Sequence, residues 1–349
     1  MAPDDLTDEW LSEILGTTVS VTGTKRIGDG LVGMNLRLAL VASDAREADL
    51  LGVPTSLIAK LPSDDPISRA TGMGLRNYER EVKFYSELAP TLDIRRPRCF
   101  HADWTASDGE FVLLLEDLAP GAQGNQVTGC STEHARVSVL ELAKLHGPRW
   151  GDSTLDDLEW LGRRTSDDAA QLTMLWSMFL PSFMHTYRRY LTTEGAELIE
   201  RFGSRLTDWI DGREGPYTVT HGDYRLDNLM FATDQGGYPV AAVDWQTPGQ
   251  GLGATDVSYF LGAGPLVETR REIERGLVRD YGAALAGYGV AVDDAKLWHQ
   301  YARDAYAGIL MSVIASQIVG SNERSEAMFA AMATRHTQHA LDLESESLL

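Results

Sequence analysis

The sequence predicts an α+β protein of two lobes, a sheet-rich lobe followed by a helical one. Short segments with alternating apolar residues dominate the chain up to about residue 118. Beyond that point, apolar residues recur at helical spacing over long segments. The 349 residues also suffice for two lobes, because a domain takes about 100–200 residues. We therefore predict a sheet-rich N-terminal lobe at 1–118 and a helical C-terminal lobe at 119–349.

The first lobe is expected to hold several short strands and one prominent helix. Leu36, Leu38 and Leu40 alternate with less apolar positions, which is typical of a strand with one buried face. The predicted helices lie at 6–15 and 75–88, and the predicted strands at 18–24, 36–41, 56–61, 98–104 and 110–116.

The second lobe is expected to be mainly helical, with a few short strands between the helices. The predicted helices lie near 132–147, 168–190, 195–211, 266–286 and 291–319, with another from about 323. The predicted strands lie at 217–220, 229–231 and 239–243.

Charge and composition exclude several classes of partner, among them nucleic acids and membranes. The chain has 51 acidic residues against 31 Lys plus Arg, a formal net charge of −20. Nucleic acids are held by clustered Lys and Arg, so we expect no nucleic-acid partner. Two cysteines, Cys99 and Cys130, are too few for a disulfide framework. No stretch approaches about 18 uncharged apolar residues, so we expect no membrane partner and a cytoplasmic protein.

One polar segment carries the strongest chemical signal in the chain. His221-Gly222-Asp223 is followed by Asn228, and Val243-Asp244-Trp245 comes at the end of the predicted strand at 239–243. Asn228 and Asp244 offer the oxygen ligands that Mg²⁺ prefers. Asp223 is then left to orient a hydroxyl nucleophile and accept its proton. Asp and Asn also cap ordinary polar turns, but the position between short apolar strands favours the chemical interpretation.

These segments resemble the catalytic and metal-binding segments of the aminoglycoside phosphotransferase and choline kinase group. The similarity is greatest to its ecdysteroid-kinase-like and general phosphotransferase branches. The resemblance implies a bilobal protein-kinase-like fold and ATP- and Mg²⁺-dependent phosphorylation of a hydroxyl on a small molecule. It also implies that the lobe at 1–118 binds the nucleotide and that the lobe at 119–349 is the catalytic and acceptor-binding lobe. It assigns catalysis to Asp223 and metal binding to Asn228 and Asp244.

The resemblance also implies that the first lobe binds the nucleotide through a Lys and a Glu. Lys60 ends a predicted strand and is the sole Lys between Lys25 and Lys83, which suits a cation for the α- and β-phosphates. Its partner is expected on the helix at 75–88. Glu81 matches the family position best and Glu79 is the alternative, because residues two apart point to different faces of a helix.

Two backbone segments are further candidates for nucleotide binding. Gly28, Gly30 and Gly33 form a G-x-G-x-x-G pattern, but a strand follows it, so a dinucleotide-binding turn is excluded. A glycine-rich hairpin loop close to the phosphates fits better, with a ligand-free hairpin as the alternative. Glu116 and Leu118, where the lobes would join, are expected to contact adenine through their main chain, as the resemblance implies.

Four neighbouring residues receive supporting roles. Asp256 is expected to cap a helix while bracing the catalytic loop, and His221 to support the loop by hydrogen bonding. Asp227 is expected to be a solvated loop carboxylate. Arg225 has two open interpretations, a contact to the γ-phosphate or an ion pair with a nearby acid.

The sequence leaves a second function open. A non-catalytic nucleotide-binding pseudokinase, acting as a sensor or scaffold, would share the fold, although every expected polar residue is present. Phosphorylation of a protein Ser or Thr ranks last, since no peptide-binding activation segment is evident between Asp244 and Asp256. The acceptor is expected to be a small molecule with a hydroxyl; a polycationic aminoglycoside suits the acidic chain, but sugars, amino alcohols, macrolides and sterol-like alcohols also fit.

Overall fold

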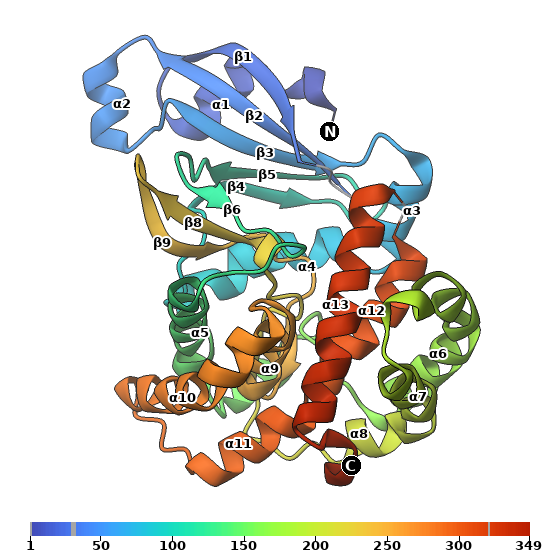
Figure 1. Cartoon of the computed structure of the whole chain (residues 1–349). Coiled ribbons are helices and arrows are strands. Elements are labelled where there is room, and N and C mark those ends of the chain that lie inside the picture. The colour runs from blue at the N-terminus through green and yellow to red at the C-terminus, as the bar shows by residue number, and fades with distance from the viewer. Residues whose placement is uncertain (1, 29–32, 320–321) are drawn as a thin grey trace. The chain divides into compact units, whose positions relative to one another are not determined.

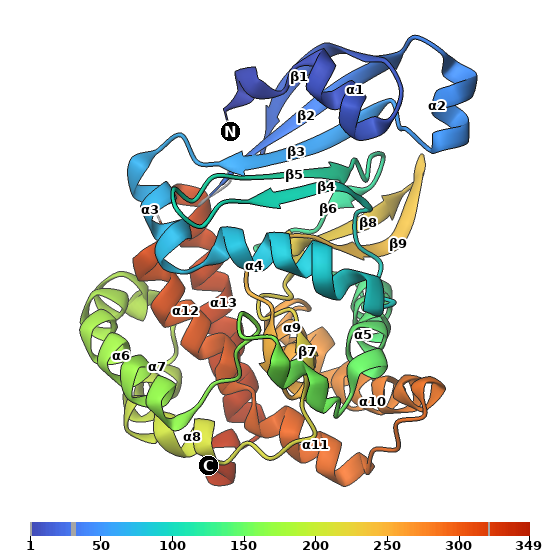
Figure 2. The same cartoon turned by 180° about the vertical axis from the view of Figure 1, so that it is seen from behind.

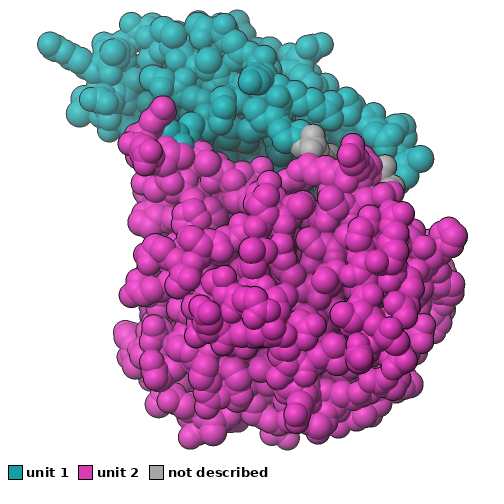
Figure 3. Space-filling view, in the orientation of Figure 1, with its two compact units in different colours: residues 1–90, 96–120, 243–247 teal, residues 91–95, 121–242, 248–349 magenta. Residues whose placement is uncertain are grey.

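The computed structural model describes residues 2–28, 33–319 and 322–349 of the chain (Figure 1). The chain forms two compact units, which Figure 3 colours separately. Unit 1 comprises residues 1–90, 96–120 and 243–247, and unit 2 comprises residues 91–95, 121–242 and 248–349. The short segment 243–247 therefore belongs to unit 1, although the chain on both sides of it belongs to unit 2.

Unit 1 is built on an antiparallel sheet with strand order β1-β2-β3-β5-β4. Its strands are β1 (Val19–Ile27), β2 (Gly33–Ala42), β3 (Ser56–Pro62), β4 (Cys99–Trp104) and β5 (Phe111–Glu116). Its helices are α1 (Asp8–Leu15), α2 (Ala45–Leu51), α3 (Pro66–Gly74) and α4 (Asn77–Lys83). The short helices α2 and α3 are not among the predicted helices.

The predicted alternation along β2 is confirmed. Leu36, Leu38 and Leu40 are buried in one apolar core with residues of α1, β3 and β5, whereas Val41 is exposed. The Thr7 side chain accepts a hydrogen bond from the Trp10 amide and so begins α1, which packs against β1. The alternating leucines thus fix which face of the sheet is buried.

The predicted helix at 75–88 forms with a change of pitch. It begins at Asn77 as α4 and continues from Phe84 to Leu88 as a turn of π-helix. Tyr78, Val82 and Leu88 are all buried, so the helix keeps the apolar face that its spacing predicts.

Unit 2 is mainly helical, with short strands around its polar loops. Its helices are α5 (Thr132–His146), α6 (Ser166–Tyr187), α7 (Thr193–Phe202), α8 (Leu206–Asp211), α9 (Gly253–Ala263), α10 (Val267–Leu285), α11 (Asp294–Arg303), α12 (Tyr306–Ile318) and α13 (Glu323–Asp342). Its strands are β6 (Ala122–Gln123), β7 (Thr218–Thr220), β8 (Leu229–Thr233), β9 (Gly236–Ala242) and β10 (Gly249–Gly251). No helix in the described ranges is both long and apolar enough to cross a bilayer.

Helices α12 and α13 form the centre of unit 2. They pack against each other, and α6, α7 and α9 pack around them (Figures 1 and 2). The core between them is rich in aromatic residues, among which Trp176, Phe202, Trp209 and Tyr306 are buried. The two small sheets, β6-β8-β9 and β10-β7, lie at either end of the polar segment that contains the candidate catalytic residues.

Two of the predicted long helices are wrong in extent. The helix predicted at 291–319 divides into α11 and α12, because Asp304 leaves helical geometry and turns its buried carboxylate toward Arg213 and Thr255. The helix predicted at 195–211 divides at Gly203, where a Cβ atom would lie only 2.7 Å from the Trp176 ring. In both cases a contact from another helix overrides the local apolar period.

The far end of α13 is tied to α10 by an ion-pair cluster. Nε and Nη2 of Arg271 each lie 2.8 Å from a carboxylate oxygen of Asp342, and the buried Arg270 also donates to it. Burial alone would raise the pKa of Asp342, but hydrogen bonds from Arg271, Gln338 and Arg270 outweigh it and lower the pKa to about 2.

We predict that Asp342→Asn lowers the stability of the protein at neutral pH. The folded-state pKa lies below the unfolded value of about 3.9, so the contribution is full above that value and is lost as pH falls toward 2. Urea unfolding at neutral pH and near pH 3 should therefore show a difference from wild type that shrinks with acidity. Glu268→Gln is the control, since Glu268 also pairs with Arg271 but is 81% exposed. A difference that is independent of pH would contradict the assignment.

Candidate active site

The loop between β7 and β8 begins with backbone that Asp256 holds in place. Asp256 Oδ2 accepts a hydrogen bond of 2.7 Å from the His221 amide, and Oδ1 accepts one of 3.2 Å from the Gly222 amide. Gly222 has φ +80°, which glycine adopts without strain. His221 is buried, and its Nδ1 lies 3.3 Å from the Asp223 amide. These contacts fix the direction in which the Asp223 side chain leaves the loop.

Three side chains donate hydrogen bonds to the Asp223 carboxylate. The Tyr259 hydroxyl donates to Oδ1 at 2.7 Å. Arg225 Nε donates to Oδ2 at 3.1 Å, and Asn228 Nδ2 donates to the same oxygen at 2.9 Å. Even so, the Asp223 side chain is 20% exposed to solvent. Asp223 is thus held in one orientation while its side chain stays partly exposed.

Asn228 lies beside Asp223, at the end of a 3-10 turn over Leu226–Asn228. Its Nδ2 donates to the main-chain oxygen of Asp223 as well as to the carboxylate, both at 2.9 Å. Among the described residues no side chain or amide donates to its Oδ1, which leaves a carbonyl oxygen for a ligand. An oxygen of this kind fits Mg²⁺.

Arg225 is engaged by acids of the loop. Its Nε contacts Asp223, and its Nη1 lies 2.8 Å from Asp227 Oδ2, so the ion-pair interpretation applies in this structure. The expectation for Asp227 was wrong. Asp227 is 5% exposed and accepts hydrogen bonds from Arg225 and from the Gln126 amide, because its carboxylate joins the loop to the segment that precedes α5.

The expected bracing role of Asp256 agrees with its contacts, but the expected cap was wrong. Helix α9 begins at Gly253 with Leu252 as its N-cap residue, so Asp256 lies within the first turn. There its carboxylate is taken up by the His221 and Gly222 amides and by His146, whose Nε2 lies 3.3 Å from Oδ2. The side chain points out of the helix and cannot also cap it.

In unit 1, Lys60 lies between two carboxylates. Its Nζ is 2.7 Å from Glu81 Oε1 and 2.8 Å from Asp244 Oδ1. Burial alone would lower the pKa of Lys60, but Asp244 and Glu81 outweigh it and raise the pKa above its usual value. Of the two candidate partners, Glu81 contacts Lys60, whereas Glu79 is held by Arg76 and Lys83.

Asp244 reaches this cluster through an uncommon backbone conformation. Its φ of +65° lies in the left-handed region, which Asp tolerates better than most residues. The next residue, Trp245, is fully buried and stacks on Phe84 with ring centroids 3.9 Å apart. The Trp245 amide also donates to Glu81 at 3.2 Å. The stacked Trp245 ring and the Trp245 amide together hold Asp244 in place beside Lys60. An acidic residue in a strained backbone conformation is a candidate functional residue.

The three glycines of the hairpin differ in position. Gly28 follows β1 with φ +67°, and Gly30 lies outside the described residues. Gly33 is the first residue of β2 and pairs with Pro62 rather than belonging to the loop tip. A Cβ atom on Gly33 would meet the Leu61 carbonyl oxygen at 3.2 Å, which explains glycine there. Their role in phosphate binding stays a prediction.

The predicted adenine-binding connector follows β5. The Glu116 amide donates to the Arg98 carbonyl at 2.8 Å, and Leu118 is buried. Between them, the Asp117 carboxylate accepts hydrogen bonds from Arg37 at 3.0 Å and from the Ser56 hydroxyl at 2.6 Å. Asp117 therefore stiffens the connector, while the adenine contacts of Glu116 and Leu118 stay a prediction.

Sequence reasoning missed three residues that support these groups: Tyr259, His146 and Asp117. Tyr259 carries the clearest available signal, since it follows Asp256 by one helical turn and so shares its face of α9. His146 and Asp117 contact residues far away in the chain, so the local sequence around them does not predict their roles. The structure brings Asp223 together with Asn228, and Lys60 together with Glu81 and Asp244. The metal site that Asn228 and Asp244 would share stays a prediction.

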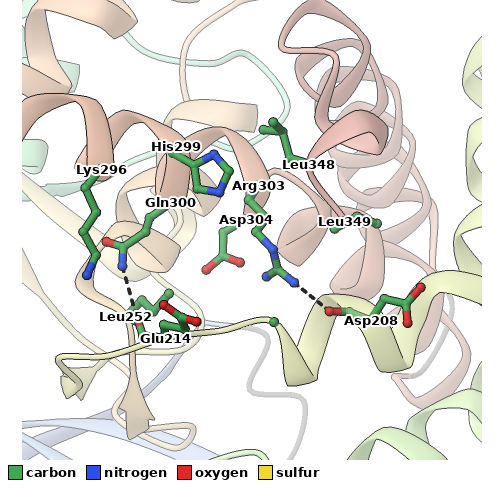
Figure 4. A pocket seen from close by; sticks show the side chains of 11 residues that line it. Asp208, Glu214, Leu252, Lys296, His299, Gln300, Arg303, Asp304, Leu348 and Leu349 are labelled. Carbon is green, nitrogen blue, oxygen red and sulfur yellow. Dashed lines mark hydrogen bonds between the residues drawn. The ribbon is translucent and has the colours of Figure 1, made fainter.

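A cavity of about 320 Å³ in unit 2 contains none of the predicted site residues (Figure 4). Acidic and basic side chains line it, and two of its polar groups are already engaged: Gln300 donates to the Glu214 carbonyl, and Arg303 to the Asp208 carbonyl. The part of the chain that the structure describes also holds no cluster of three or more His, Cys, Asp or Glu suited to a metal.

Solved structures of phosphotransferases resemble this chain over nearly its whole length. Choline kinase from Cryptosporidium parvum Iowa II is 12% identical, covers 94% of this chain and 91% of its own, and has a TM-score of 0.58. The GDP complex of aminoglycoside 2'-phosphotransferase-IIIa is 11% identical, with coverage of 93% and 94% and a TM-score of 0.55. Macrolide 2'-phosphotransferase MphH from Brachybacterium faecium is 19% identical, with coverage of 94% and 97% and a TM-score of 0.50.

These likenesses confirm the predicted fold class, an α+β fold of the protein-kinase-like type. The model of the phosphotransferase enzyme family matches residues 74–293, more than half of the chain. The chain therefore belongs to the phosphotransferase enzyme family, as the catalytic-loop motif indicates. No curated protein matches it significantly.

We predict that Asp256→Ala destabilises the protein. The substitution leaves the buried His221 amide and the half-buried Gly222 amide without their acceptor, and an unsatisfied buried donor costs about 1–3 kcal/mol. Urea unfolding measures the loss, with Asp234→Ala on the exposed turn after β8 as the control. An Asp256→Ala variant as stable as the control would show that the loop does not depend on this carboxylate.

Proposed function

We propose that the protein is an ATP- and Mg²⁺-dependent kinase that phosphorylates a hydroxyl group of a small molecule. The observation that carries the proposal is the Asp223 carboxylate, which three donors hold in one orientation beside the amide of Asn228. Membership of the phosphotransferase family supports phosphoryl transfer as the reaction. The proposed reaction uses groups from both units.

Lys60 is the proposed ligand of the nucleotide phosphates. An ammonium group has three donors, and Glu81 and Asp244 take two of them, so one remains for a phosphate oxygen. The paired carboxylates keep Lys60 charged and its position fixed. The GDP bound in a structurally similar phosphotransferase supports nucleotide binding, and the adenine would be held by the main chain of Glu116 and Leu118.

Mg²⁺ would be held by Asn228 Oδ1 and the Asp244 carboxylate, both hard oxygen ligands. When bound, the ion neutralises charge on the phosphate oxygens. Asp244 is 39% exposed at its side chain, so its carboxylate is accessible to an ion despite its contact with Lys60.

Asp223 is the proposed catalytic residue. The acceptor oxygen forms a bond to the γ-phosphorus as the bond from phosphorus to the β–γ bridging oxygen breaks. The acceptor's proton passes to the Asp223 carboxylate and then to solvent, so that the products are a phosphate ester, ADP and a proton. Orientation and late proton acceptance are the main demands of such a loose transition state.

The acceptor class is tested with a panel in which ATP consumption is measured with Mg²⁺. The panel covers aminoglycosides, macrolides, choline-like amino alcohols, neutral sugars and sterols, and the names of the similar structures support the first three. GTP replaces ATP in a parallel series. Consumption that depends on one acceptor supports the proposal and names the class. Nucleotide binding without turnover on any acceptor would favour the non-catalytic pseudokinase, and a lack of Mg²⁺-nucleotide binding would refute both.

We predict that Asp223→Asn abolishes turnover and leaves Mg·ATP binding nearly intact. Loss of a general base costs about 10²–10⁴ in rate, whereas nucleotide binding is assigned to other residues. Turnover is measured with the acceptor that the panel identifies, and the dissociation constant of Mg·ATP by calorimetry. Asp234→Asn, on an exposed turn of the same unit, is the control. Turnover at the wild-type rate would refute the role of Asp223.

We predict that Asp244→Ala weakens ATP binding in the presence of Mg²⁺ only. The variant loses a proposed metal ligand, while Lys60 keeps Glu81 and gains a free donor for phosphate. Titration of ATP with Mg²⁺ and with EDTA separates the two effects. If the ratio of the two dissociation constants equals that of wild type, Asp244 does not bind the metal.

A further inference from the structure

The donors around Asp223 divide unevenly between its two carboxylate oxygens. Oδ2 accepts from both Arg225 Nε and Asn228 Nδ2, whereas Oδ1 accepts from the Tyr259 hydroxyl and from no other group of the described residues. A carboxylate oxygen has two lone-pair directions. The two hydrogen bonds fill those of Oδ2, and one direction of Oδ1 remains for a further donor.

Tyr259 is held so that its hydroxyl can serve only this oxygen. It lies on α9 one helical turn after Asp256, and it is 4% exposed. Burial, followed by the charge of Asp223, holds the pKa of Tyr259 well above its usual range. The hydroxyl therefore stays protonated and acts as the donor.

The plane of the Tyr259 ring is fixed by His336 on α13. The two rings stack with centroids 5.4 Å apart and planes 15° from parallel. Both nitrogens of His336 lack hydrogen-bond partners among the described residues. Burial lowers the pKa of His336 well below its usual range, so the imidazole is neutral and contacts Tyr259 by ring stacking. Gly308 on α12 makes room for it, since a Cβ atom there would lie 2.0 Å from the His336 ring.

We propose that Oδ1 of Asp223 is the atom that receives the acceptor's proton, and that Tyr259 is a positioning residue that presents this oxygen. The proposal rests on the proposed function. The acceptor O–H donates along the remaining lone pair of Oδ1, its oxygen bonds to the γ-phosphorus, and the bond from phosphorus to the bridging oxygen of ADP breaks. The proton ends on Oδ1, and the Tyr259 hydroxyl prevents the carboxylate from rotating during transfer.

The test compares two Tyr→Phe variants, each of which loses only the hydroxyl group of a tyrosine. Tyr259→Phe keeps the ring that stacks on His336 and removes only the donor to Asp223. Tyr301→Phe is the matched control, because Tyr301 is also fully buried and its hydroxyl donates to a buried carboxylate, Glu274, at 2.8 Å. Melting temperatures of both variants show whether the packing survives.

The readout is Mg²⁺-dependent ATP turnover, measured with water alone as acceptor and with the acceptor that the panel identifies. We expect Tyr259→Phe to lower kcat about 10- to 100-fold with the nucleotide KM unchanged, because a misplaced reacting group costs up to about 10²-fold. Tyr301→Phe should keep the wild-type kcat.

Other results would overturn either the role of Tyr259 or the proposed function. A wild-type kcat in Tyr259→Phe, or an equal loss in Tyr301→Phe, would overturn the role of Tyr259 alone. A wild-type protein that neither binds nor turns over Mg·ATP would overturn the proposed function, and this assignment with it. The two failures are distinguishable because the wild-type measurement is made first.

Discussion

A carboxylate that leaves water must find hydrogen-bond donors, and this requirement organises both groups of candidate site residues. Asp256 is 2% exposed and takes its donors from the backbone of the catalytic loop. Glu81 is fully buried and takes Lys60 and the Trp245 amide. An unpaired buried acceptor or charge costs more than a typical hydrogen bond gains. The acids therefore determine where the loop backbone and the lysine lie.

Helix α9 transmits this constraint to the side chain of the candidate catalytic residue. Nearly every residue of α9 is buried, so the helix cannot shift without disturbing the core on several sides. Asp256 and Tyr259 leave it one turn apart, and they hold respectively the backbone and the carboxylate of the same loop. Fixed geometry of this kind reduces the reorganisation that a reaction requires.

The sequence predicts those parts of the molecule that depend on local order. The β2 alternation, the apolar face of α4 and the extent of α10 follow from the spacing of apolar residues, and the motif around Asp223 and Asn228 is contiguous in the chain. The break at Asp304 does not follow from local spacing, because it depends on contacts with Arg213 and Thr255, which are far away in the chain. Nor does the hydrogen bond from Tyr259 to Asp223, because residues 36 positions apart in the chain meet only after folding.

The choice between Glu79 and Glu81 shows where local reasoning ends. Both lie on α4 and both are nearly buried, so composition and spacing favour neither strongly. The contacts decide the matter, since Arg76 and Lys83 flank Glu79 along the same helix, whereas Glu81 faces Lys60 on β3. A helix that carries two acids on different faces thus places one in a local ion-pair network and the other against the sheet.

The contacts described above for each group of site residues come from the same unit. Asp244 takes its position from Lys60 and from the stacked ring of Trp245, all in unit 1, although the flanking strands β9 and β10 belong to unit 2. Asp223 takes its position from α9 and the loop itself. Substitutions that alter the lysine cluster should therefore leave the orientation of the Asp223 carboxylate unchanged. In the proposed kinase, Asn228 links nucleotide affinity to proton acceptance, because it donates to the Asp223 carboxylate and offers its Oδ1 to the metal.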